Sequence, residues 1–137
     1  MGKVIVKVQL TSQSDLVLKS RKVLKGNPRE VEAETLVDTG ATRLYLKPSV
    51  IRALGLKKVD HVLSQTTNGI RRRGVYEPVR LEILGRRGIF EVVDIDEHLP
   101  NLLGQIPLEY LDLVVATKRR RLIPNPEHGE KLMTEEY

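Results

Sequence analysis

The chain has 137 residues, of which 40% are hydrophobic and 30% charged, and this fits one soluble globular domain with a sizeable core. Only 4% are aromatic, so the core must be built from Val, Leu and Ile, a composition that favours β-sheet. The lack of cysteine excludes disulfides, thiolate metal sites and a cysteine nucleophile. Without a signal-peptide core after Met1, or any apolar run long enough to span a membrane, a cytoplasmic protein is expected.

Strands and turns are predicted along the first third of the chain. Lys3–Leu10 alternates apolar and polar residues, as a strand with one buried face does. Leu16–Leu24 is a weaker candidate strand that carries several basic residues, as edge strands often do. Gly26–Pro28 is a turn, after which Val31–Val37 is predicted to form a strand that ends directly before Asp38.

The middle of the chain predicts one short helix and a long hairpin. After a short strand at Leu44–Leu46, Pro48 begins a helix that Gly55 ends. Val59–Thr67 is predicted to be a strand that leads into Asn68-Gly69, the strongest hairpin signal in the sequence. The return strand is expected from Ile70 to about Leu84.

The remaining elements complete an all-β domain. In order they are a turn at Gly85–Gly88, a strand at Ile89–Ile95, a loop at Leu99–Asn101, a short helix at Pro107–Asp112, a core strand at Leu113–Ala116 and a pairing segment at Arg121–Ile123. About eight short strands with one or two short helices describe a small closed barrel or a sandwich. We expect one domain over residues 1–123 and a flexible tail over residues 124–137.

The most informative stretch is Leu36-Val37-Asp38-Thr39-Gly40. The apolar pair is expected to end a buried strand and Gly40 to form the sharp turn after it, so that Asp38 is presented at the end of the sheet. Thr39 can form local hydrogen bonds. A carboxylate held in this way suits acid–base chemistry, whereas the simpler interpretation is an ordinary turn containing Asp and Gly.

Two stretches and a hairpin together resemble the retropepsin-like aspartic proteases, in particular the small single-domain members of bacteria and archaea. Leu36–Thr42 is similar to the catalytic loop of that family, and Asn101-Leu102-Leu103-Gly104 to the apolar-apolar-Gly element that packs beneath the loop. The Asn68–Ile70 hairpin stands where the family has its flap. The resemblance implies a small closed retropepsin barrel with one or two short helices, working as a homodimer.

The resemblance implies peptide-bond hydrolysis by two aspartates that share one proton and activate a water. The sequence contains only one Asp-Thr-Gly, so the second aspartate is expected from a second copy of the chain. Asp38 is then the acid–base, the Thr39 hydroxyl bonds across the dimer axis, and Gly40 permits the tight loop. Ala41 and Thr42 line the part of the cleft that binds the substrate backbone. Neither a metal nor any other cofactor is expected.

The flap and the supporting element complete the implied site. Asn68, Gly69 and Ile70 would form the flap tip, closing over an extended polypeptide. Leu102, Leu103 and Gly104 would support the site structurally. The chain departs from many retroviral members in having Thr42 and Gln105 where those enzymes have an acidic residue and an arginine, so the ionic brace between those positions is in doubt.

Other interpretations of the sequence are weighed against this one. Arg71–Arg73 could favour acidic substrates or anionic partners, but a solvated strand end is the preferred interpretation. Nucleic-acid binding is not expected because no aromatic residues are interleaved with the basic runs. No metal site is expected at Asp94–Glu97, which lacks a glycine-punctuated ligand loop. The alternative function is a retropepsin-fold dimer that acts as a protein-binding or regulatory module with little or no peptidase activity.

Overall fold

The computed structural model describes residues 3–116, 118–129 and 132, and this part of the chain contains nine strands and three helices. The strands are β1 (Ile5–Ser12), β2 (Glu30–Val37), β3 (Leu44–Leu46), β4 (Lys58–Thr66), β5 (Gly69–Ile83), β6 (Arg86–Asp94), β7 (Asn101–Leu103), β8 (Leu113–Ala116) and β9 (Arg121–Pro124). The helices are α1 (Gln13–Ser20), α2 (Pro48–Leu54) and α3 (Gln105–Tyr110). The fold is mostly β, as predicted, and it has three helices where one or two were expected.

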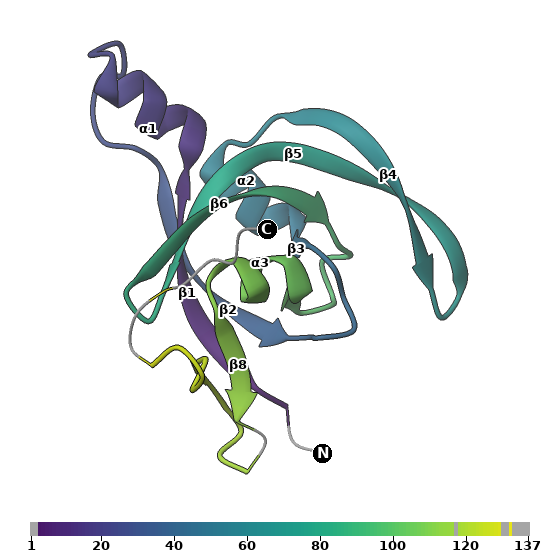
Figure 1. The fold of residues 1–137 in the computed structure, drawn as a ribbon. Coiled ribbons are helices and arrows are strands. Elements are labelled where there is room, and N and C mark those ends of the chain that lie inside the picture. Colours follow the sequence, from purple (N-terminus) through teal and green to yellow (C-terminus); the bar gives the residue numbers. More distant parts are fainter. Residues whose placement is uncertain (1–2, 117, 130–131, 133–137) are drawn as a thin grey trace, which may run out of the picture.

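Six of the strands close into a barrel. Their order is β1-β2-β7-β3-β6-β5, and β5 closes the ring by pairing with β1, for example at Leu10 and Leu81. β4 extends the sheet outside this ring by pairing with β5, and β8 and β9 form a separate two-stranded sheet. Figure 1 shows α1 projecting from one side of the barrel and the long β4–β5 hairpin arching out on the other.

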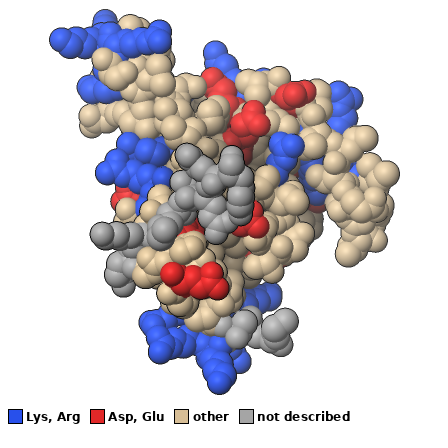
Figure 2. Space-filling model, in the orientation of Figure 1, with Lys and Arg blue, Asp and Glu red and all other residues tan. Residues whose placement is uncertain are grey.

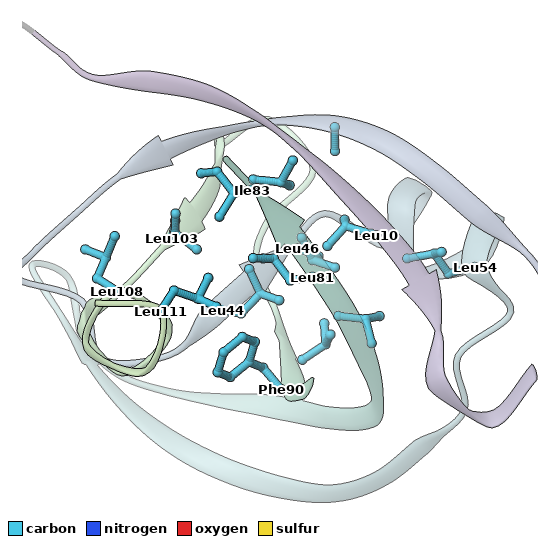
Figure 3. Close-up of a cluster of buried hydrophobic side chains, with 14 of the residues drawn as sticks. Leu10, Leu44, Leu46, Leu54, Leu81, Ile83, Phe90, Leu103, Leu108 and Leu111 are labelled. Carbon is cyan, nitrogen blue, oxygen red and sulfur yellow. The ribbon is translucent and has the colours of Figure 1, made fainter. Parts of the chain in front are cut away.

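Aliphatic side chains fill the barrel, as the low aromatic content predicts (Figure 3). Leu10, Leu46, Leu81 and Leu103 come from four different strands and are all fully buried. The alternation predicted for the first strand is confirmed, because Leu10 lies in the core whereas Ile5 is 58% exposed. The helix predicted after Leu46 is also confirmed as α2.

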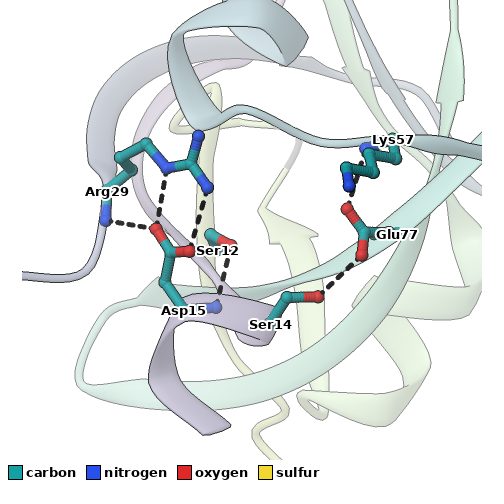
Figure 4. A network of polar contacts seen from close by, with 6 residues as sticks. All are labelled: Ser12, Ser14, Asp15, Arg29, Lys57 and Glu77. Atoms are coloured by element: carbon teal, nitrogen blue, oxygen red, sulfur yellow. Dashed lines mark hydrogen bonds and ion pairs between the residues drawn. The ribbon is translucent and has the colours of Figure 1, made fainter. Parts of the chain in front are cut away.

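The strand predicted at Leu16–Leu24 is wrong, because this region begins with helix α1. The Ser12 side chain caps the helix by accepting a hydrogen bond from the Asp15 N–H at 3.2 Å. The buried Asp15 carboxylate is in turn held by Arg29, which donates from its backbone N–H, Nε and Nη2 over 2.8–2.9 Å (Figure 4). These polar contacts outweigh the weak alternation of the sequence.

The turn predicted at Gly85–Gly88 is also corrected. The two turn residues are Leu84 and Gly85, both with positive φ, and β6 begins at Arg86. Gly88 lies within β6, opposite Leu81 of β5, and the rings of Phe90 and Tyr110 occupy the space beside it. A Cβ at Gly88 would come within 2.6–2.8 Å of these rings.

The C-terminal strands predicted at Leu113–Ala116 and Arg121–Ile123 are present as β8 and β9. Beyond β9 the chain is bonded to the turn between α3 and β8, because His128 Nδ1 lies 2.6 Å from Asp112 Oδ2 and the Asn125 N–H donates to the Asp112 carbonyl at 2.9 Å. The predicted tail otherwise falls largely on residues 130–131 and 133–137, which lie outside the described residues.

Basic side chains are spread over the face shown in Figure 2. Two of the places where they gather are the α1 region, which carries Lys19, Arg21, Lys22 and Lys25, and the lower end of the molecule, near the β8–β9 turn. No helix in the described part of the chain is long and apolar enough to cross a membrane.

Candidate active site

Asp38 follows β2 directly and is fixed by main-chain and side-chain hydrogen bonds. Its N–H donates to the carbonyl of Leu103 at 3.0 Å. Its carboxylate Oδ1 accepts from the Gly40 N–H at 2.9 Å, and its carbonyl accepts from the Ala41 N–H at 3.1 Å. The loop therefore turns tightly around the carboxylate, which stays half-buried while Thr39 and Gly40 are exposed.

The element β7 lies directly under this loop. It is inserted between β2 and β3, parallel to β2 and antiparallel to β3, with Leu103 opposite both Val37 and Leu44. Where β7 passes into α3, the N–H groups of Gln105 and Ile106 each donate over 2.8 Å to carbonyls of the loop, those of Ala41 and Thr42. Two stretches distant in the sequence thus form one unit.

Gly104 is needed where these two stretches meet. Its N–H donates to the Arg43 carbonyl at 3.0 Å. A Cβ at this position would lie 2.4 Å from the same carbonyl oxygen and 2.8 Å from that of Ala41. Because these are backbone atoms that cannot turn aside, only glycine lets the two segments approach so closely.

Asn101 is a supporting residue whose role the sequence did not reveal. Its buried amide donates to the Glu34 carbonyl on β2 at 2.9 Å and accepts from the Lys47 N–H, before α2, at 2.8 Å. It was expected in a loop, but it begins β7 and joins that strand to β2 and α2. No local pattern marks Asn101 as a buried amide, because its partners Glu34 and Lys47 are distant in the sequence.

A cleft of about 750 Å³ opens above the loop. Asp38, Gly40, Ala41 and Thr42 line one wall, together with Leu102, and residues 62–67 of the β4–β5 hairpin line the other. Thr39 is not among the lining residues, and neither are the expected tip residues Asn68, Gly69 and Ile70. The hairpin contributes to the cleft mainly through β4, the strand before its tip, and through Arg73 on β5.

The tip of this hairpin differs by one residue from the prediction. The two-residue turn is Thr67-Asn68, and Gly69 already pairs with Thr66 as the first residue of β5. Thr66 Oγ1 donates to the Gly69 carbonyl at 2.7 Å, which fixes this register. Gly69 has a φ of +107°, which glycine adopts at little cost.

Arg73 was expected at a solvated strand end, but it is only 9% exposed and lines the cleft. Its Nη1 donates to Asp96 Oδ1 at 3.0 Å, and Arg71 Nη2 reaches the same oxygen at 3.4 Å. The hydrogen bond from Arg73, with the positive charges nearby, lowers the pKa of Asp96. Arg73 is the clearest site feature that sequence reasoning missed.

No group of three or more His, Asp or Glu side chains in the described residues is arranged to hold a metal ion. The arrangement that is present is a carboxylate on a tightly bonded loop, facing a cleft with a long hairpin on its other side. Such a site can move protons to and from a substrate placed between the loop and the hairpin.

The fold is that of the retropepsin-like aspartic proteases. The EIAV protease, solved in complex with the inhibitor HBY-793, superposes with a TM-score of 0.55 at 14% sequence identity over 79% of this chain and 86% of that chain. The sequence pattern of the aspartyl protease family matches residues 24–105, which include the Asp38 loop and β7. The chain therefore belongs to the aspartyl protease family. No curated protein matches the chain.

Proposed function

We propose that this protein is an aspartic endopeptidase that acts as a homodimer, with Asp38 of each subunit forming the catalytic pair. The observation that carries the proposal is Asp38 itself, bonded to Leu103 at the end of β2 and lining the cleft beneath the β4–β5 hairpin. One chain supplies one Asp-Thr-Gly, so the second carboxylate has to come from a second copy related by a two-fold axis.

The chemistry follows from placing two carboxylates side by side. They share one proton because both cannot be ionised at such a short separation. The ionised carboxylate takes a proton from a water that attacks the scissile carbonyl carbon, and the other carboxyl group gives its proton to the carbonyl oxygen. As the tetrahedral intermediate collapses, the C–N bond breaks, and the carboxyl group that took the water proton gives it to the amide nitrogen. The other carboxylate takes back a proton from a hydroxyl of the intermediate, which restores the singly protonated pair. In this proposal Thr39 bonds across the axis and holds both loops in register.

The β8–β9 hairpin is the surface we assign to dimer formation. The described part of β8 pairs with β9 alone, so the two-stranded sheet has edges to which a second copy can add. Val115 and Leu122 pack toward the core. Val114 and Ile123 lie opposite each other on the two strands, on the side of the hairpin away from the core, and are only partly buried. The N-terminal strand is less suitable because β1 already lies between β2 and β5.

The β4–β5 hairpin is proposed as the flap. It reaches out from the barrel as a two-stranded ribbon (Figure 1). Ile70, near its tip, is 66% exposed. An extended polypeptide would lie between this ribbon and the loop at Ala41 and Thr42, pairing its backbone with theirs. Closure of the hairpin, with Asn68, Gly69 and Ile70 at its tip, would exclude water from the cleft.

The test is cleavage of a peptide library between pH 4 and 8 by the wild type and by Asp38→Asn, with products identified by mass spectrometry. Asn retains the oxygen that accepts from the Gly40 N–H, so the loop should keep its shape. We expect cleavage to fall by about a thousandfold or more in the variant, within the range for loss of an acid–base group with its charge stabilisation.

The outcomes separate the candidate functions. Equal cleavage by both proteins would refute the role of Asp38. No cleavage by a wild-type protein that sedimentation shows to be dimeric would instead support the alternative, a retropepsin-fold dimer that binds proteins without cutting them.

A further inference from the structure

Arg73 lies on the side of the β4–β5 hairpin that faces the cleft. It is opposite Val62 on β4, and both residues line the cleft. Its neighbour Arg72 is exposed and is not among the lining residues, because successive side chains of a strand point to opposite faces. Of these two adjacent arginines, one is therefore set into the substrate cleft and the other faces solvent.

The charge around Arg73 is not balanced. Arg71 and Arg73 share a single carboxylate oxygen, Oδ1 of Asp96, so this group of three side chains keeps one net positive charge. Arg43 adds a second guanidinium to the lining of the cleft. Asp38 contributes the one carboxylate among the lining residues, and it is committed to the proposed reaction.

Arg73 also retains hydrogen-bonding capacity. A guanidinium group has five N–H donors, and in the described residues Arg73 uses one of them, on Nη1, for Asp96. The side chain is 10% exposed, and it is held in place by that bond rather than moving freely in solvent. A charge that is positioned in this way and shielded from bulk salt binds a carboxylate more strongly than a mobile surface arginine does.

We propose that Arg73 is a specificity-determining residue that binds an acidic side chain, Asp or Glu, of the polypeptide in the cleft. The inference rests on the proposed function, because it concerns the substrate of the same site. The carboxylate of the substrate accepts hydrogen bonds from the remaining N–H groups of Arg73 and offsets the unbalanced positive charge shared with Arg71. Asp96 holds the guanidinium in position.

The test uses peptides derived from a cleaved sequence, in which one Glu is moved through the positions on either side of the scissile bond. Each peptide has a partner with Gln at the same position. At one position we expect the wild type to prefer Glu about tenfold in kcat/KM, mainly through KM, because a charge-assisted hydrogen bond is stronger than a neutral one. Added salt should weaken the preference only slightly, because the pair is shielded from bulk solvent.

Three variants assign that preference to Arg73. Arg73→Gln should bring the Glu-to-Gln ratio close to one, and Arg73→Lys should restore part of it, since the charge returns without the planar fork. Arg72→Gln is the matched control, with the same change of charge one residue away on the exposed face, and should keep the wild-type ratio. A ratio is unaffected by a uniform loss of folded protein, and thermal unfolding of each variant checks folding separately.

A binding measurement separates this inference from the proposed function. Library peptides that differ only by Glu or Gln at one position are titrated into the Asp38→Asn protein, with and without Arg73→Gln. A Glu preference in binding that Arg73→Gln removes supports the role of Arg73 even if the wild type cleaves nothing. Cleavage without any Glu preference, or with one that survives Arg73→Gln, overturns the role of Arg73 and leaves the peptidase proposal standing. Absence of both cleavage and preference overturns both.

Discussion

The backbone N–H of Asp38 donates to the carbonyl of Leu103 at 3.0 Å, which joins the first residue after β2 to the last residue of β7. This bond continues the parallel pairing in which Val37 lies opposite Leu103. The carboxylate is thus positioned by a strand that is distant in the sequence, and not by its own turn alone. The rigidity of the site depends on how closely β7 and the following glycine approach the loop.

Gly104→Ala should destabilise the domain by about 1–3 kcal/mol, the usual cost of forcing atoms into a closely packed region. The new Cβ would lie 2.4 Å from the Arg43 carbonyl oxygen, so the loop and β7 would have to move apart. Urea unfolding followed by circular dichroism measures the change in the free energy of unfolding. A variant as stable as the wild type would show that this contact is not tight in solution.

Gly40→Ala makes the same change at the glycine of the Asp38 loop. Its Cβ would lie 3.3 Å from Asp38 Oδ1, a side-chain atom, and the residue is exposed with no left-handed φ. We expect stability to change by less than about 0.5 kcal/mol, as at most surface positions. Peptide cleavage should nevertheless fall about tenfold or more, because small displacements of a reacting group are costly. Unchanged cleavage would contradict a role for Gly40 in substrate approach.

Ile123→Glu should convert the proposed dimer to a folded monomer. Ile123 faces Val114 on the side of the β8–β9 hairpin away from the core, so a charge there would be buried at the proposed interface but would reach solvent in the monomer, where the residue is only partly buried. Analytical ultracentrifugation measures the change in mass, and peptide cleavage should disappear with the dimer. Val23→Glu, at a 63% exposed position near α1, is the control and should remain dimeric. If both variants stay dimeric, the interface lies elsewhere.

Mixing subunits tests the shared site directly. When wild-type protein exchanges with a tenfold excess of Asp38→Asn, almost every wild-type subunit acquires an inactive partner. Cleavage per wild-type subunit should therefore fall to about a tenth if each site needs two copies of Asp38. Activity is measured after exchange and compared with a mixture assayed before exchange. Cleavage that does not change on mixing would mean that one subunit holds a complete site.

Local sequence patterns predicted much of this structure because their causes are local. Pro48 and Gly55 lie at the two ends of α2, and the alternation before Leu10 marks a strand with one buried face. The single Asp-Thr-Gly and the distant Leu-Leu-Gly predicted a shared site, and their segments are hydrogen bonded to each other. The barrel follows from the resemblance carried by these motifs.

The parts that the sequence did not predict depend on partners far away along the chain. Helix α1 depends on Arg29, which reaches back to Asp15. Arg73 belongs to a run of three arginines that resembles a solvated strand end, and its position in the cleft is decided by Asp96 on a different segment. Neither partner can be identified from composition or periodicity, because each contact joins two separate segments of the chain.

The Asp15–Arg29 ion pair makes the fold sensitive to acid. Asp15 is 2% exposed, and the hydrogen bonds from Arg29 lower its pKa below the ordinary value of 3.8. A carboxylate whose pKa is lower in the folded than in the unfolded state contributes stability above the unfolded-state value, and that stability is lost as the pH falls through the folded-state pKa. The stabilisation by this pair should therefore be complete at neutral pH and disappear below 3.8.

Asp15→Asn should accordingly reduce the free energy of unfolding at pH 7 by about 1–3 kcal/mol, because the three donors of Arg29 lose a charged acceptor. The difference from the wild type should shrink as the pH is lowered below 3.8, where the wild-type carboxylate also loses its charge. Urea unfolding at several pH values measures both quantities. Glu32→Gln is the control, since Glu32 pairs with Lys7 at 3.9 Å with both side chains more than 60% exposed. Such a surface pair contributes about 0–1 kcal/mol, so a loss as large as that of Asp15→Asn would contradict the importance of burial.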